Sequence, residues 1–458
     1  MTKWSQKFLI ILILAALVCL PPLGTGYFQL WQASTTADPG AASKSYETAA
    51  ILLFWRPDLY EKAGLLAGGE PQRAIQLLTT AREHGSLSTN GQVSLAEAYL
   101  ANGQTNQAVE LLQSLLSTNQ EISRVGPLLT KYYWDREQFD ESTRALQHWL
   151  AADPHNPQAS QQLGLILAAQ AAPEAVQLLQ AADAFGYTDL INALGVPGGQ
   201  AYRLVRCGQA LANINEWRLA EQAFSRATAV DGTYAEAWAW LGLARQHNST
   251  SGGQQAVQNA IKLNGQSAAI RVIVGTYYQQ NGNPAEAVTQ FKTATRLEPG
   301  NPAWWAALGS AAAQSDLSVA LNAYIQAVNL APDQAVYWYA LAAFCVERNA
   351  YIDDYGLNAA LRAYALEPDN PLYMDMLGRT QTTAGMYQPA EVMLKKALAA
   401  AGSTPLATEI HLHLGLLYLQ NSRNDLSKFE LEQTVTLDRA AAGPYGSQAQ
   451  KLLERYFP

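Results

Sequence analysis

The chain has few charged residues and few cysteines, and both shortages exclude classes of function. Only 15% of its 458 residues are charged, the net charge is −8, and Lys395-Lys396 is the longest basic cluster. Nucleic-acid-binding proteins neutralise phosphates with clustered Lys and Arg, so we expect no nucleic-acid partner. The three cysteines, Cys19, Cys207 and Cys345, form no close pair. We therefore predict no disulfide framework and no CxxC redox site.

Groupings typical of catalysis or of cofactor binding are also lacking. His411 and His413 stand at i and i+2, which places them on different faces of a helix and gives no metal-ligand spacing. Gly198-Gly199 is not followed by the Lys-Ser/Thr of a phosphate-binding loop. We expect no catalytic residues, no metal and no cofactor, and hence a protein that is not an enzyme.

Long uncharged stretches are rare, and the N-terminus holds the main one. Lys3 and Lys7 precede the apolar run Phe8–Leu20, and the next charged residue is Asp38. This order is typical of a signal sequence or a signal anchor. Because the positive residues lie on the N-terminal side, the N-terminus is predicted to stay in the cytoplasm and the rest of the chain to lie outside it.

Two interpretations of this segment differ in whether it is retained. Extended through Tyr27, it has twenty residues, about 30 Å of helix at roughly 1.5 Å per residue, which is the thickness of a bilayer's hydrocarbon core. Tyr27, Phe28 and Trp31 would then lie near the membrane–water interface. We favour a retained, single-pass anchor. The alternative is a signal peptide cleaved near Gly24-Thr25-Gly26, followed by secretion.

A repeated pattern covers most of the chain. A small residue that follows an aliphatic one recurs every 33 to 37 residues, with one longer step of 44 between Gly164 and Gly208. The series comprises Ala96, Thr130, Gly164, Gly208, Gly242, Gly275, Gly309, Ala342, Gly378 and Gly415. A second small residue follows about twelve positions later, with a bulky one four further on, as in Ala287 and Phe291. Such a period is typical of paired helices stacked into a solenoid.

The pattern resembles the tetratricopeptide repeat, whose 34 residues fold as two antiparallel helices. Residues 268–301 carry it most fully, and Trp238, Trp305 and Trp338 supply the leading aromatic residue in other units. The matching residues of 268–301 are Val274-Gly275, Tyr278, Ala287, Phe291, Ala294 and Pro299. The resemblance implies an all-α, right-handed superhelical solenoid of about eleven hairpins, preceded by one transmembrane or signal helix. The first hairpin, near 55–88, has Lys62 where the small residue belongs.

The spacing also predicts how the chain divides. We expect a signal anchor and flank at 1–34, an N-terminal array at 35–184 and a C-terminal array at 201–441. The long step and its run Gly195-Val196-Pro197-Gly198-Gly199 predict an irregular connector at 185–200. The apolar residues Leu452, Leu453 and Tyr456 predict a capping helix within 442–458.

In proteins with such repeats, the first helix of each hairpin lines a groove that binds peptides or helices. Carried over by position, the resemblance implies a groove of mostly uncharged residues and a protein or peptide partner. These residues are Lys131, Trp134, Gln209, Gln246, Thr276, Gln279, Ser310, Tyr339, Asp375 and Arg379. We predict a membrane-tethered scaffold that joins proteins outside the cytoplasm, in an envelope or secretion-type complex. The alternative is a receptor for a soluble peptide or glycan.

Overall fold

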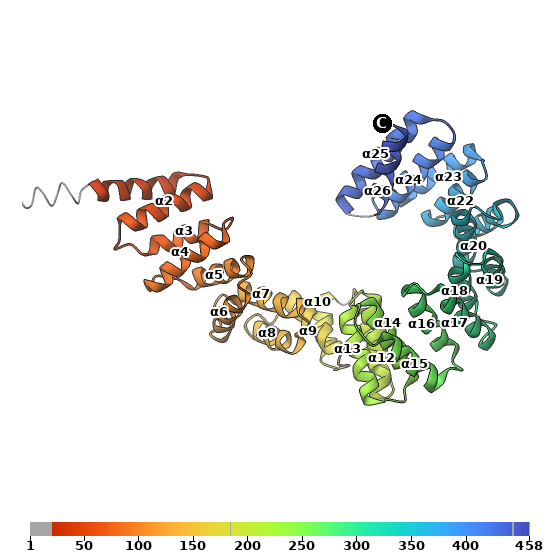
Figure 1. The fold of residues 1–458 in the computed structure, drawn as a ribbon, viewed down its shortest axis with the longest axis horizontal. Coiled ribbons are helices and arrows are strands. Elements are labelled where there is room, and N and C mark those ends of the chain that lie inside the picture. The colour runs from red at the N-terminus through yellow and green to blue at the C-terminus, as the bar shows by residue number, and fades with distance from the viewer. Residues whose placement is uncertain (1–20, 184, 442–443, 458) are drawn as a thin grey trace, which may run out of the picture. The chain divides into compact units, whose positions relative to one another are not determined.

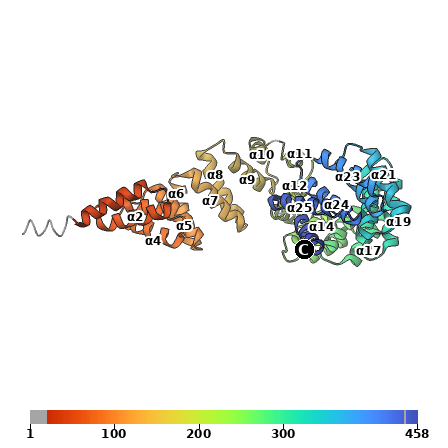
Figure 2. The same ribbon diagram turned by 90° about the horizontal axis from the view of Figure 1, so that it is seen from above.

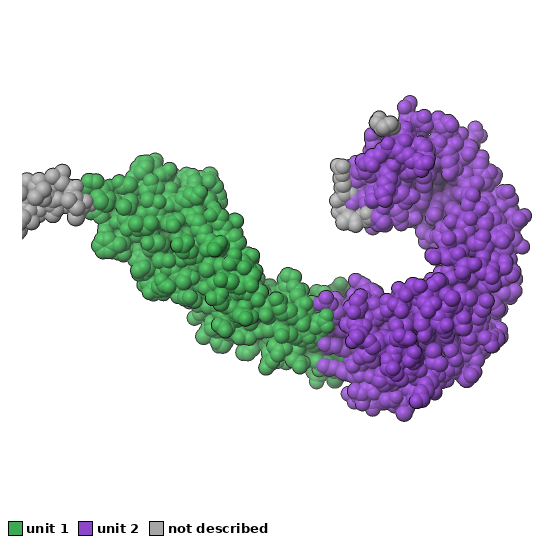
Figure 3. Space-filling view, in the orientation of Figure 1, with its two compact units in different colours: residues 1–198 green, residues 199–458 purple. Residues whose placement is uncertain are grey.

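The computed structural model describes residues 21–183, 185–441 and 444–457, which form two compact units. Unit 1 is Met1–Gly198 and unit 2 is Gly199–Pro458 (Figure 3). In the described residues every regular element is a helix (Figure 1). This agrees with the predicted all-α fold.

Unit 1 begins with a helix over residues 21–35 and continues as consecutive helix pairs that follow one another in chain order (Figures 1 and 2). Its further helices are α2 (Pro39–Leu52), α3 (Asp58–Leu66), α4 (Pro71–Glu83), α5 (Thr89–Ala101), α6 (Thr105–Ser117), α7 (Ile122–Asp135), α8 (Phe139–Ala152), α9 (Pro157–Ala168), α10 (Ala175–Asp183) and α11 (Thr188–Gly195).

Unit 2 repeats the same arrangement and ends in a single helix. Its helices are α12 (Gln200–Asn213), α13 (Trp217–Val230), α14 (Ala235–His247), α15 (Gly253–Asn264), α16 (Ala268–Gln280), α17 (Pro284–Leu297), α18 (Pro302–Ala312), α19 (Leu317–Leu330), α20 (Ala335–Arg348), the π-helical turn η1 (Ile352–Gly356), α21 (Leu357–Leu366), α22 (Pro371–Thr383), α23 (Tyr387–Ala401), α24 (Pro405–Gln420), α25 (Asn424–Ala441) and α26 (Tyr445–Tyr456). Its first helices contact one another in succession from α12 through α24, so they form a continuous layer.

Asn-Pro pairs begin several of these helices. Proline lacks the N–H that a helix leaves unbonded in its first turn, and the asparagine before it accepts one of the remaining N–H groups. Asn156 accepts from Ala159 N at 3.0 Å, and Asn283, Asn301 and Asn370 cap α17, α18 and α22 in the same way. The starts of these helices are therefore determined by residues next to each other in the sequence.

The leading tryptophans hold each turn against the helix that follows it. The indole N–H of Trp238 donates to the Gly232 carbonyl at 2.9 Å. Trp305 and Trp338 donate in the same way to the carbonyls of Pro299 and Pro332, at 2.8 and 2.9 Å. Each acceptor lies six residues before its donor, so the bond recurs with the repeat.

The recurring small residues lie where the two helices of a pair approach closely. A methyl group on Gly275 would lie 2.8 Å from Cε1 of Phe291, and one on Gly378 would lie 2.5 Å from Cγ of Leu394. Gly164, Gly208, Gly242, Gly309 and Gly415 meet Leu179, Phe224, Val257, Tyr324 and Leu431 in the same way. The predicted role of these positions is confirmed. In the pair formed by α3 and α4, the close contact is made by Gly64, which faces Leu78. The prediction that Lys62 occupies this position was therefore wrong by two residues.

The residues that follow Leu20 form a helix that packs against α2. Leu23 and Leu30 of the helix over residues 21–35 pack against Ala49, Ala50 and Leu53. This segment is therefore half of an additional helical pair with α2. The apolar run Phe8–Leu20 lies outside the described residues. Among those that are described, no helix combines the length and apolar character needed to cross a membrane.

The predicted irregular connector at 185–200 contains a helix, α11. Leu190 and Ala193 are both buried, and their spacing of three puts them on one helical face. This helical spacing was overlooked because the glycines and the proline that follow it directly are typical of an irregular segment. The boundary between the two units lies after Gly198, within this segment.

Cys207 and Cys345 are fully buried, as their positions in the repeat predict. Burial raises the pKa of each thiol to about 12. Both are therefore protonated and unreactive at neutral pH, because the thiolate is the reactive form.

The glycine contact gives a direct test of the repeat register. Replacing Gly275 with Leu forces a large side chain against Phe291, so we expect a loss of at least about 1 to 3 kcal/mol in the free energy of unfolding. Gly300 has open space around it, so Gly300→Ala is the control and should leave stability nearly unchanged. Denaturant titration followed by circular dichroism measures both. An unchanged midpoint for Gly275→Leu would contradict the helix contact.

Candidate functional site

A pocket with a mixed polar and apolar lining lies at the C-terminal end of unit 2, between α20, α22, α24 and α26. Its volume is about 260 Å³. The polar residues of its lining are Arg379, Thr382, Thr383, Glu409, His413, Gln420, Tyr445 and Gln448. Three first helices, with α20 contributing Val346, and the terminal helix thus supply its wall.

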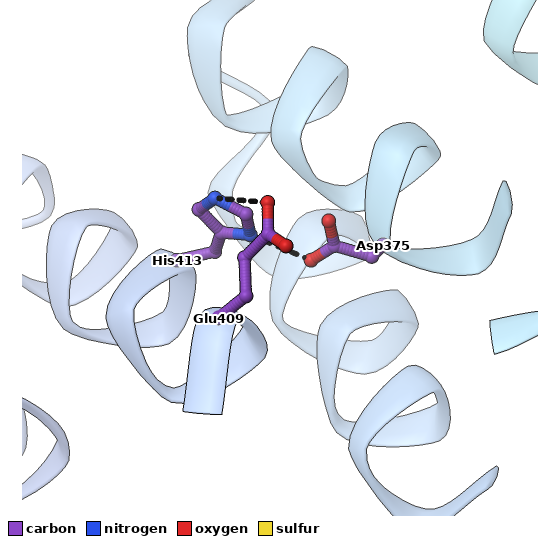
Figure 4. Close-up of side chains that lie close together, drawn as sticks. All are labelled: Asp375, Glu409 and His413. Atoms are coloured by element: carbon purple, nitrogen blue, oxygen red, sulfur yellow. Dashed lines mark hydrogen bonds and ion pairs between the residues drawn. The ribbon is translucent and has the colours of Figure 1, made fainter. Parts of the chain in front are cut away.

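A buried histidine–aspartate pair supports the pocket from behind (Figure 4). His413 Nδ1 on α24 lies 2.8 Å from Asp375 Oδ1 on α22, and Asp375 is only 1% exposed. The contact fixes the imidazole ring, because a second group that holds one ring nitrogen orients the other. His413 Nε2 lies 3.9 Å from Oε1 of Glu409, one helical turn before it.

Glu409 connects the His413–Asp375 pair to two other residues of the pocket lining. The hydroxyl of Tyr445 on α26 donates to Glu409 Oε2 at 2.8 Å, and Arg379 Nη1 lies 3.9 Å from Oε1. Burial, followed by the hydrogen bond to Glu409, raises the pKa of Tyr445 to about 12. The phenol therefore remains a hydrogen-bond donor at neutral pH.

Asp375, Glu409 and His413 offer donor atoms within 4.8 Å of one another, so we considered a metal ion. His413 Nδ1 already contacts Asp375, and Glu409 already accepts from Tyr445. The guanidinium of Arg379, 3.9 Å from Glu409, opposes a further positive charge. The arrangement therefore fits a hydrogen-bonded network better than a metal centre.

Three of the predicted groove residues lie around this network. Asp375 is its buried acid, Arg379 lines the pocket, and Tyr339 on α20 lies within electrostatic range of both. Burial is the largest cause of the raised pKa of Tyr339, and Arg379 opposes it. The Tyr339 ring also lies 5.7 Å from that of Tyr373, so it is held in place.

The other predicted groove residues of unit 2 lie on successive first helices. Gln209 donates to Glu236 at 3.0 Å, which connects α12 to α14. Gln279 lies 3.5 Å from the Ser310 hydroxyl, which connects α16 to α18. The Thr276 hydroxyl bonds back to the carbonyl of Val272 in its own helix, and Gln246 is half-buried on α14.

Lys131 and Trp134 belong to unit 1, on α7. The Lys131 ammonium pairs with Asp135 at 2.9 Å, and its side chain is 74% exposed. Trp134 packs edge-on against Phe139 with 5.5 Å between ring centres. Every residue that lines the pocket belongs to unit 2, so these two residues are not part of its lining.

Glu409, His413 and Tyr445 were not among the predicted site residues. The spacing of four between Glu409 and His413 was a usable signal, since it places them on one helical face. Tyr445 carried no such signal, because it reaches the site only through the packing of α26. The expectation that His411 and His413 face different ways is confirmed: His411 contacts Glu430 at 2.6 Å, whereas His413 contacts Asp375.

The fold is that of an α-helical solenoid, a class of repeat protein with extended binding surfaces. Two segments match models of the tetratricopeptide repeat, residues 65–132 and residues 275–317. These matches support a tetratricopeptide-repeat protein. The sequence matches none of the curated proteins.

Several solved structures are similar in their helical architecture. Yeast Tom70 is 15% identical, with 96% of each chain covered and a TM-score of 0.42. The Cut9 and Hcn1 hetero-tetramer of the APC/C is 15% identical, with 93% of this chain and 89% of that chain covered and a TM-score of 0.37. MamA from Desulfovibrio magneticus RS-1 is 19% identical, covering 38% of this chain and 96% of that chain with a TM-score of 0.33.

The buried pair predicts a large effect on stability. Replacing His413 with Leu leaves the Asp375 carboxylate buried without its partner, and removing one member of a buried pair costs about 3 to 5 kcal/mol. His155 is exposed, so His155→Leu is the control. Chemical denaturation at pH 7 should show a lower unfolding free energy for His413→Leu alone. Equal stability of the two variants would argue against the pair.

Proposed function

We propose that the chain is a non-enzymatic scaffold that binds protein segments, with the pocket of unit 2 as a partner site. The tetratricopeptide repeats support a role in protein–protein interaction. The observation that carries the proposal is the pocket itself, an open space of about 260 Å³ whose lining includes His413, Arg379 and two threonines. A partner entering it would complete hydrogen bonds that water otherwise satisfies.

The chemistry of the pocket favours a polar, nearly uncharged peptide segment. Arg379 and Glu409 both line it, so their charges offset one another and leave little field to attract a strongly ionic ligand. Tyr339 adds an aromatic surface close by. Recognition would therefore depend on hydrogen bonds and stacking more than on charge.

We also propose that the scaffold is attached to a membrane, with its repeats outside the cytoplasm, and that it is part of an envelope or secretion-type complex. Lys3, Lys7 and the run Phe8–Leu20 support this. Cleavage at Gly24–Gly26 would cut a helix whose Leu23 packs against α2, which favours retention over a removable signal. A receptor for a soluble peptide or glycan remains the second candidate, because the same pocket suits either.

Fractionation of cells that express the full chain tests the tether. We expect the protein in the membrane fraction after alkaline carbonate washing, with its repeats digested by protease added outside the cytoplasmic membrane. Removal of Phe8–Leu20 should abolish the membrane association that resists carbonate washing. Recovery of the full chain in a soluble fraction would contradict the tether, and protection of the repeats from external protease would reverse the orientation.

Capture of partners from detergent-solubilised membranes tests the pocket. We expect Tyr339→Ala to weaken binding of the captured protein by about 2 kcal/mol or more, as buried aromatic residues do at interface centres. Arg379→Ala should also weaken it, whereas Arg362→Ala, an exposed change in the same unit, and Lys131→Ala should not. Affinity should depend weakly on salt. Steep salt dependence, or full affinity of both the Tyr339→Ala and Arg379→Ala variants at unchanged melting temperature, would place the partner elsewhere.

A further inference from the structure

Six large apolar side chains are exposed at the start of unit 1, on the helix over residues 21–35 and at the end of α2. They are Tyr27, Phe28, Trp31, Ile51, Phe54 and Trp55, which are between 45% and 81% exposed; we name them the aromatic patch. The rings of Phe28 and Trp31 lie 5.9 Å apart, and those of Phe54 and Trp55 lie 5.1 Å apart. Apolar residues gathered in this way mark an interaction surface.

The two halves of the aromatic patch come from the two sides of the first helical pair, which contact each other next to Tyr27 and Phe54. A methyl group on Gly26 would lie 2.8 Å from Leu53 Cγ, and Tyr27 lies within electrostatic range of Arg56. Beneath them, Ala49, Ala50 and Leu53 form a buried core with Leu23 and Leu30. Since the pair has a core of its own, the exposed rings are not needed to hold it together.

The chain that leads into this pair points to what covers the aromatic patch. The apolar run Phe8–Leu20 ends immediately before the helix over residues 21–35 and has thirteen residues, fewer than the roughly twenty that usually span a bilayer. A hydrocarbon core is about 30 Å thick. A short span is accommodated by local thinning and by interfacial side chains beside it, so the residues next to Leu20 must lie close to the bilayer.

The composition of the aromatic patch suits that position. Trp and Tyr are enriched at the membrane–water interface because their rings combine an apolar body with a polar edge. Arg56, at its border, is held by Asp58 through two hydrogen bonds of 2.8 Å. This pair has no net charge, which reduces the cost of bringing it near lipid.

We propose that the aromatic patch inserts into the interfacial layer of the bilayer and fixes the first helical pair against the membrane. The inference rests on the proposed tether and extends it. The tether alone attaches the chain at one point, whereas a docked pair gives unit 1 a defined orientation at the surface. Phe54 and Trp55, far from the anchor in sequence, are then part of the membrane contact.

Spin labelling of the full chain in phosphatidylcholine–phosphatidylglycerol vesicles tests the docking. Phe54→Cys places a label in the aromatic patch, and Phe185→Cys places one at a comparably exposed ring that is 93% exposed elsewhere in unit 1. Both changes are made with Cys19→Ser, and Cys207 and Cys345 are buried and do not compete for the label. Accessibility to oxygen and to a water-soluble nickel chelate reports the depth of each label.

At position 54 we expect a severalfold higher ratio of oxygen to nickel accessibility than at position 185, which should behave as in water. Equal ratios at both positions, with the protein bound to vesicles, would overturn the docking and leave the tether standing. Protein that floats free of vesicles would overturn both. Dipolar broadening between labels at position 54 of two molecules would show that the aromatic patch contacts a second copy of the chain. That result would also overturn the proposal.

Discussion

The structure depends on the close approach of two helices within each pair. At the crossing point the first helix carries glycine, alanine or another small residue, and the second carries a large apolar side chain that fills the space, as Phe291 does opposite Gly275. Packing in protein interiors is dense enough that one added methyl group is felt. Since each pair also packs against the next, the same contact repeated along the chain builds the whole solenoid.

This stacking also creates the candidate site. Because the first helices of unit 2 follow one another, α22 and α24 lie side by side, and Asp375 reaches His413 although 38 residues separate them. The terminal helix α26 then covers α24 and α25 with Leu452 and Leu453. In doing so it brings Tyr445 to Glu409, so one helix both caps the core and completes the pocket wall.

Packing of helices in pairs also includes residues 21–35, near the N-terminus. In the sequence, residues from Phe8 to Tyr27 look like one uninterrupted membrane segment. In the structure, Leu23, Gly26 and Leu30 pack against α2 and the residue that follows it, so the residues after Leu20 belong to a helical pair. The aromatic residues that follow are then presented by a folded pair, together with Phe54 and Trp55.

The sequence by itself determined the repeat, because the spacing of Gly208, Gly242 and Gly275 reflects helix contacts within single pairs. Helix starts were equally local, as Asn301-Pro302 illustrates. Only the tertiary structure decided which side chains meet between pairs: Asp375 with His413, Tyr445 with Glu409, and residues 21–35 with α2. These contacts depend on how neighbouring pairs are rotated and where the terminal helices pack. Such geometry is set by the summed packing of many side chains, and no single spacing in the sequence records it.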